Sequence, residues 1–130
     1  MPIKYKLVEK GQPGIVGGGE KKWYAAIVND GEMTVDDLVK SIEKFSALSE
    51  ADIKGVIIAL ENVIQDALAS SKIVRLEKLG TLYPSLSSQG VVNAEEFAAA
   101  THIRGSKVNY RPGKRISDAL STATFKKSGK

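Results

Sequence analysis

The stretch from residue 49 to 70 constrains the fold most, because it has the pattern of a long helix that is apolar around most of its circumference. Its main stripe, at the spacing of one helical face, consists of Ile53, Val56, Ile57, Leu60, Val63, Ile64, Ala67 and Leu68. Ile58 and Ala59 widen this stripe beyond the width that a single sheet would cover. A chain of 130 residues has little other material to bury the remainder.

A second copy of the chain is the simplest cover for this helix, because a two-fold interface packs the helix against its own copy. We therefore predict a homodimer, with an interface that includes Ile57, Leu60, Val63 and Ile64. The alternative is that the N-terminal β-element covers the second face of the helix.

Two capping signals delimit the predicted helices. Ser49 and Asp52 stand three residues apart, as do Thr34 and Asp37. A hydroxyl followed by a carboxylate at this spacing satisfies free backbone N–H groups at a helix start. We predict helices over about 34–45 and 49–70.

After residue 72 the apolar period changes to two, which is typical of strands. We predict short strands within 73–78, 79–82 and 107–110. The polar, glycine-flanked segment 87–105 between them predicts a protruding arm or a long loop. A Pro-Gly turn then leads into a final helix over about 114–124.

The first thirty residues predict a small β-element. Residues 3–8 alternate like a half-buried strand, residues 23–28 form an apolar aromatic run, and a glycine-rich connection over 11–19 separates them. Trp23 and Tyr24 are predicted to form the core of this element; the alternative is that they stack on bases of a single strand.

Charge divides unevenly along the chain. Residues 1–71 have a net charge of −3 and residues 72–130 one of +7, which together give the overall +4. Such an asymmetry is expected where one surface faces a polyanion. The sequence has no cysteine, no apolar run long enough to cross a bilayer and no signal-peptide pattern, so we expect a soluble cytoplasmic protein without disulfides.

No constellation of catalytic residues is evident. His102 is the sole histidine and has no clustered ligand partners for a metal. Glu95 and Glu96 are neighbours in sequence and would point about 100 degrees apart on a helix, which is wrong for a paired acid and base. Segment 14–19 lacks the ending of a phosphate-binding loop. We expect no enzymatic activity, no cofactor, no metal and no small-molecule substrate.

Residues 34–125 resemble the bacterial histone-like HU and integration host factor family. Two blocks carry the resemblance: Val74-Arg-Leu-Glu-Lys-Leu-Gly-Thr-Leu82, which is similar to the strand pair of the family, and Lys107-Val-Asn-Tyr-Arg-Pro-Gly-Lys114, which is similar to its strand and turn before the last helix. The N-terminal extension resembles that of an HU-like variant found in Bacteroidetes.

The resemblance implies a homodimer whose two arms embrace the minor groove of double-stranded DNA with little sequence preference, in the bacterial nucleoid. The phosphate contacts that it implies are Arg75, Lys78, Lys107, Arg111, Lys114 and Arg115, with Arg104 as a groove contact at the base of the arm. The chain departs from the family at the arm tip, where residues 89–100 have neither a proline nor a basic residue but have Glu95 and Glu96. This departure puts kinking by an inserted proline in doubt.

The sequence therefore predicts an α+β protein with an HU-like fold: two helices, a three-stranded antiparallel sheet with a protruding β-arm, and a C-terminal helix. We expect a β-strand extension over 1–31, the DNA-binding domain over 32–125 and a flexible basic tail over 126–130. The alternative function is a protein-interaction module on the same fold, with weak or no DNA binding.

Overall fold

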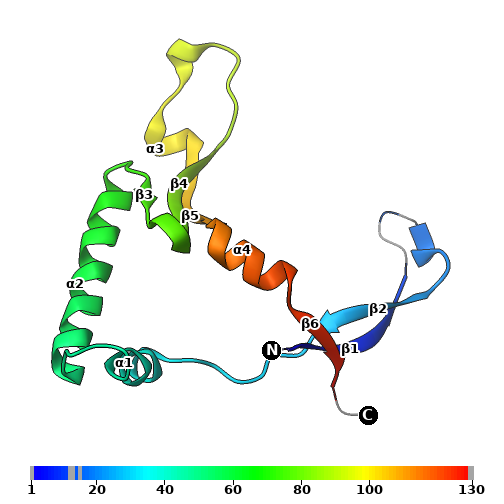
Figure 1. Ribbon diagram of the computed structural model, residues 1–130. Helices are drawn as coiled ribbons and strands as arrows, with labels where there is room; N and C mark the ends of the chain where they lie inside the picture. The colour runs from blue at the N-terminus through cyan, green and yellow to red at the C-terminus, as the bar shows by residue number, and fades with distance from the viewer. Residues whose placement is uncertain (1, 12–13, 15, 129–130) are drawn as a thin grey trace. The chain divides into compact units, whose positions relative to one another are not determined.

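The computed structural model describes residues 2–11, 14 and 16–128. Within them lie four α-helices and two three-stranded sheets, so the predicted α+β class is confirmed. The chain divides into two compact units (Figure 1): residues 1–34 together with 119–130, and residues 35–118.

The first unit contains a sheet with the strand order β2-β1-β6. β1 (Pro2–Lys10) pairs antiparallel with β2 (Lys22–Ile27), with Leu7 opposite Ala25. This confirms the predicted N-terminal β-element and shows it to be a hairpin. A short 3-10 turn, η1 (Val16–Gly18), lies in the glycine-rich connection, whose residues 12, 13 and 15 are outside the described part.

The third strand of this sheet corrects the predicted C-terminal tail. β6 (Thr124–Lys127) pairs parallel to β1, and the Ser128 N–H donates to the Tyr5 carbonyl at 2.8 Å. The prediction of a flexible tail is therefore wrong for Lys126 and Lys127; residues 129 and 130 lie outside the described part. Residues 119–125, expected in the DNA-binding domain, group with the N-terminal strands.

Trp23 and Tyr24 do not form a buried core in this unit. Their relative exposures are 64% and 36%. They point to opposite faces, because Trp23 is opposite Glu9 and Tyr24 is opposite Val8 in consecutive positions of the ladder. A single layer of three strands has no second layer of its own that could bury them.

The second unit begins with two helices, α1 (Val35–Glu43) and α2 (Glu50–Ala69). α2 starts where the sequence predicted, and the Ser49 Oγ accepts from the Asp52 N–H at 3.2 Å. Among the described residues, the buried apolar side chains are Val39 of α1 and Ile53 of α2, at 4% and 3% exposure. The contact of these two helices is thus the best-covered part of the unit.

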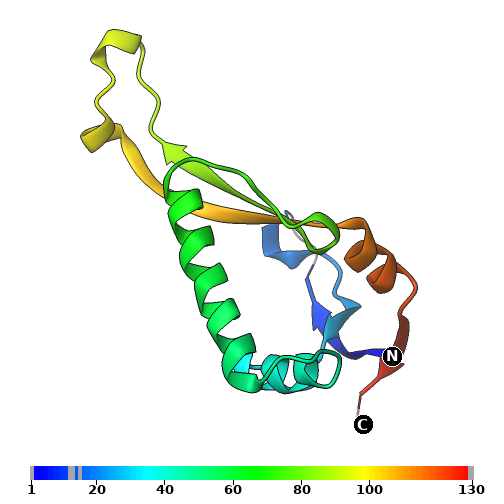
Figure 2. The same cartoon turned by 60° about the vertical axis from the view of Figure 1, so that its left-hand side comes forward.

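The sheet of this unit has the order β3-β4-β5, all antiparallel. β3 is limited to Val74–Arg75 and is followed by a 3-10 turn, η2 (Glu77–Leu79). β4 (Gly80–Ser88) and β5 (Ile103–Pro112) form a long hairpin. Its far end, residues 89–102, contains the short helices η3 (Ala94–Glu96) and α3 (Ala99–His102) and projects beyond the end of α2 (Figures 1 and 2).

The last helix, α4 (Lys114–Ser121), follows β5 directly and ends three residues before the predicted limit. Leu120 of this helix is 58% exposed. The chain leaves α4 to form β6 instead of continuing the helical pattern.

Candidate nucleic-acid interface

The β3-β4-β5 sheet has two chemically different faces. Residues that are directly opposite in a ladder point to the same side. One side, here called the polar face, consists of Arg75, Thr81, Tyr83, Ser85, Lys107, Asn109 and Arg111. The other side is mainly apolar: beside Ser106 and the end pair Gly80 and Pro112, it consists of Val74, Leu82, Pro84, Leu86, Val108 and Tyr110.

The apolar side is turned toward α2. Leu68 of α2 lines one hollow together with Pro84, Leu86 and Val108 of this side, and Ser85 and Lys107 also line it. Because opposite sides of a sheet point in opposite directions, the polar face is directed away from this helix.

Contacts on the polar face hold its side chains in place. The Asn109 Nδ2 donates to the Ser85 Oγ at 2.8 Å. The Arg111 guanidinium carbon lies 5.4 Å from the centre of the Tyr83 ring, within the range of a cation–π contact. Arg111 remains exposed, so its guanidinium is oriented yet available to an anion.

Two glycines allow a close backbone approach that places further cations at one end of the sheet. At Gly113 a Cβ would overlap the Lys78 carbonyl, and at Gly80, with φ of +131°, it would lie 2.5 Å from the Arg111 oxygen. The turn η2 therefore lies directly against the start of α4, because neither position has a side chain. This brings Lys78 to the end of the sheet where Lys114 and Arg115 begin α4.

Lys114 has a carboxylate neighbour. Its Nζ lies 3.0 Å from the Asp118 Oδ2, one turn further along α4, and both side chains are largely exposed. An exposed pair of this kind contributes little stability, so an incoming phosphate can replace Asp118 at small cost.

The predicted contacts thus separate into three groups. Three share the polar face, namely Arg75, Lys107 and Arg111; three lie at its end, namely Lys78, Lys114 and Arg115. Arg104 stands apart, because Ser87 is opposite Gly105 and Ser88 is opposite Ile103, which leaves Arg104 as the extra residue of a β-bulge.

The polar face also includes four residues that were not predicted as contacts: Thr81, Tyr83, Ser85 and Asn109. Tyr83, Ser85 and Asn109 can donate hydrogen bonds to phosphate oxygens or position residues that do. Their period-two spacing with Thr81, Lys107 and Arg111 was the signal that could have identified them.

The far end of the hairpin is a folded acidic element. The Phe97 and His102 ring centres are 5.3 Å apart, and the Ala98 N–H donates to the His102 Nδ1 at 2.9 Å. Glu95 and Glu96 are exposed, and segment 89–102 has no Lys or Arg. Phe97 therefore packs against His102 within the tip.

The four predicted interface residues of α2 divide into two pairs. Leu60 and Val63 are 47% and 66% exposed, whereas Ile57 and Ile64 are half-buried on the side of Ile53. The exposed pair leaves an apolar strip on α2 that nothing in the unit covers.

Two further properties hold across the described ranges 2–11, 14 and 16–128. They contain no group of three or more histidine, cysteine, aspartate or glutamate side chains able to hold a metal ion. Their helices are all too short or too polar to cross a membrane.

Comparison with known proteins agrees with this fold. No curated protein matches the chain. Among solved structures, one similar chain is a "Putative bacterial DNA binding protein" from Bacteroides vulgatus, with a TM-score of 0.68 and 16% identity over 98% of this chain. Our chain covers 49% of that protein and so spans about half its length.

Residues 1–127 match the HU-HIG family, described as an HU domain fused to a wHTH, Ig or glycine-rich motif. This match extends over both units, and so includes the N-terminal strands as well as the helices and the hairpin. The chain therefore belongs to the HU-HIG family of HU-like proteins.

Proposed function

We propose that this chain binds double-stranded DNA through the phosphate backbone, with little dependence on base sequence, as an architectural homodimer of the bacterial nucleoid. The observation that carries the proposal is the row formed by Arg75, Thr81 and Arg111 across the sheet, with Lys107 further along β5. Cations at fixed positions neutralise phosphates and release counterions, which drives sequence-independent binding. Membership of the HU-HIG family and the name of the similar Bacteroides protein also support DNA as the ligand.

The homodimer is supported by the incomplete core of the second unit. Val56, Leu60 and Val63 of α2 remain 47–66% exposed, and few apolar side chains are buried. Large apolar patches on a soluble protein mark interaction sites. A second copy that packs α2 against α2 would cover this strip and set two polar faces on one duplex.

The hairpin would lie along the minor groove beyond the polar face, as arms of architectural proteins do. Glu95 and Glu96 at its tip repel phosphates, and Phe97 packs on His102. The proposal therefore includes backbone contacts at the base of the hairpin and does not include kinking by a wedge at its tip. It includes no catalytic step.

The test is fluorescence anisotropy with two labelled duplexes of unrelated sequence and about 30 base pairs, at about 50 and 200 mM salt. We expect sub-micromolar affinity at low salt, equal for both duplexes and falling steeply as salt increases. Absence of binding at low salt, or a strong preference for one duplex, would contradict the proposal.

A second candidate function is supported by the tip of the hairpin. Val92 is 96% exposed and Phe97 is 41% exposed, beside Glu95 and Glu96. An exposed apolar pair with acidic neighbours suits a basic protein partner better than DNA. The anisotropy test separates the two, because a protein-docking module would bind neither duplex.

A further inference from the structure

The N-terminal sheet has a strongly cationic face. The register places five lysines on one side of its three strands: Lys4, Lys6, Lys10, Lys22 and Lys126. The other strand residues on this side are Pro2, Val8, Tyr24, Ala26 and Thr124, so none is acidic. We call this side the lysine face.

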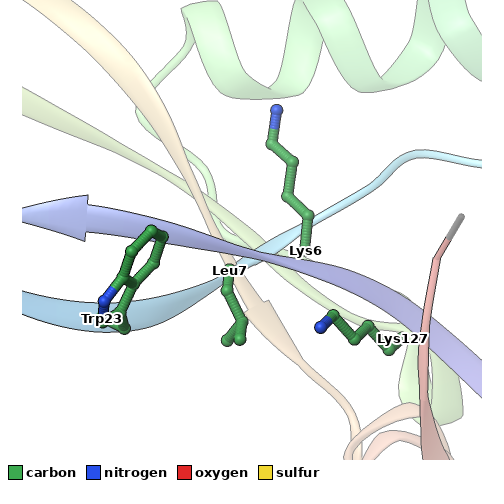
Figure 3. A pocket seen from close by; sticks show the side chains of 4 residues that line it. All are labelled: Lys6, Leu7, Trp23 and Lys127. Carbon is green, nitrogen blue, oxygen red and sulfur yellow. The ribbon is translucent and has the colours of Figure 1, made fainter. Parts of the chain in front are cut away.

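The opposite side of the same sheet is apolar. It consists of Ile3, Tyr5, Leu7, Glu9, Trp23, Ala25, Ile27, Phe125 and Lys127. Figure 3 shows Lys6 and Leu7 pointing to opposite sides of β1. A sheet with one apolar side normally leaves the other side in water, and Lys6, Lys10, Lys22 and Lys126 are indeed exposed.

The lysine face places like charges directly opposite each other. Lys10 is opposite Lys22, and Lys4 is opposite Lys126. Such cross-strand pairs destabilise a sheet. Lys4 is compensated by Asp30, 3.1 Å away; within the described residues, no carboxylate lies within 4 Å of the ammonium groups of Lys10, Lys22 or Lys126. An anion bound between these lysines would remove the repulsion.

The arrangement fits a polyanion better than a small anion. Residues rise about 3.3 Å each along a strand, so Lys4 and Lys10 are roughly 20 Å apart. One phosphate ion cannot contact cations that are so widely spaced. Duplex DNA has one negative charge for about every 1.7 Å of its axis and can contact all of them.

We propose that the lysine face is a second phosphate-binding surface, on a different unit from the polar face of β3-β4-β5, and that it binds the backbone of duplex DNA. The choice of DNA as the polyanion rests on the proposed function. The surface itself rests on the strand register and would add contacts from each copy of the chain. Bound phosphate would also offset the repulsion between Lys10 and Lys22, which are directly opposite each other.

The test compares two triple variants with the same change in charge. Lys6→Gln, Lys10→Gln and Lys22→Gln together remove three cations of the lysine face. The control combines Lys40→Gln, Lys44→Gln and Lys127→Gln, of which two lie on or just after α1 and one on the apolar side of the N-terminal sheet. Affinity for a duplex of about 30 base pairs is measured by anisotropy from about 50 to 200 mM salt, with the thermal midpoint of each free variant.

The salt slope is the decrease in the logarithm of the binding constant for each unit increase in the logarithm of the salt concentration. We expect the lysine-face variant to lower this slope by about 2.7 for each copy that contacts the duplex. For one such copy, the factor by which affinity falls between about 50 and 200 mM salt would then be about 40-fold smaller than in the parent. Its thermal midpoint should stay equal to or rise above that of the parent, since a repulsive pair is removed. The control should keep the parent slope. Equal slopes for the two triple variants would overturn the proposal, as would a variant that weakens binding only because it unfolds.

A parallel Arg111→Ala, Lys114→Ala variant separates this inference from the proposed function. If that variant lowers the slope and the lysine-face variant does not, the sheet of the second unit binds DNA alone and the inference is wrong. If the reverse holds, the lysine face binds DNA and the proposed interface is wrong. A further experiment measures binding to vesicles that contain anionic lipid. If the parent binds these vesicles more tightly than DNA, and the lysine-face substitutions abolish that binding, the surface binds a membrane and the choice of DNA is wrong.

Discussion

At the scale of single residues, the candidate interface depends on two positions where no side chain fits. Gly80 and Gly113 allow η2 to lie against the start of α4, which places the backbone of Lys78 beside Gly113, the neighbour of Lys114, although 36 positions separate the two lysines in the sequence. The close backbone contact at these two glycines therefore determines which cations lie together at this end of the sheet.

Gly113→Ala should destabilise the fold by about 1–3 kcal/mol, because the new Cβ would overlap the Lys78 carbonyl and neither backbone can move freely. Urea denaturation, fitted with one m value for parent and variant, measures the change in the free energy of unfolding. Gly90→Ala is the control, since nothing lies within 4 Å of a Cβ there. Equal stabilities of the two variants would show that the close approach does not exist.

Arg111→Ala combined with Lys114→Ala should weaken binding to all duplexes alike and lower the salt slope by roughly two for each copy that contacts the duplex, because each residue is assigned one phosphate. Anisotropy across a salt series measures the slope. Lys40→Ala with Lys44→Ala removes the same charge from exposed positions outside the interface and should leave the slope unchanged. A parent-like slope in the first variant would remove both residues from the interface.

The residues of the interface were only partly predictable. Resemblance to the family indicated Arg111, Lys114 and both glycines, because short motifs survive in the sequence. The β-bulge at Arg104 was not predictable, because a bulge is a property of the pairing between two strands.

At the scale of elements, the junction of α1 and α2 brings two carboxyl groups together. Glu43 ends α1 and Glu50 begins α2. The hydrogen bond that Glu43 shares with Glu50 raises its pKa above the usual 4.5, and desolvation and the charge of Glu50 act in the same direction. A raised pKa in the folded chain means that protonation of Glu43 favours the fold.

The stabilisation from this proton is fully present below the unfolded pKa of 4.5 and is lost as pH rises through the raised folded value. Glu43→Gln, which imitates the protonated form, should therefore raise the thermal midpoint at pH 7, and its advantage should shrink as pH falls toward 4. Melting curves of parent, Glu43→Gln and the control Glu61→Gln from pH 4 to 7 measure this. An advantage of Glu43→Gln that does not change with pH would contradict it.

α2 carries the prediction on assembly. Val63→Asp should dissociate the proposed dimer, because an unpaired charge at a buried interface costs several kcal/mol, on the order of 3–5. Gln65→Asp is the matched control, because it adds the same charge on the polar side of the helix. Sedimentation equilibrium gives the mass of each: a dimeric Val63→Asp variant would place the interface elsewhere.

The helices were more predictable than the strands. α1 and α2 have capping residues and amphipathic stripes, which are local signals. β6 was missed because Thr124–Lys127 is short, half lysine and paired with the opposite end of the chain. No local pattern indicates a strand that is defined only by a partner more than 100 residues away.

At the scale of the whole molecule, cations gather on two surfaces that belong to different units. Net charge along the sequence indicated one of them, the region after residue 72 with its +7. Net charge did not indicate the other surface, the lysine face. The lysines of β1 and β2 alternate with other residues, and the acidic residues of the first 71 positions outnumber these lysines. Period-two analysis of charge, rather than its sum, would have revealed the lysine face.

The central claim is that the polar face of β3-β4-β5 contacts the DNA backbone, and amide NMR of the labelled protein titrated with a duplex tests it most directly. We predict shifts at Arg75, Lys107, Arg111 and Lys114, equal for unrelated sequences and reversed by salt, with the amides of α1 unchanged. Shifts confined to the hairpin tip, or none at saturating duplex, would contradict the account.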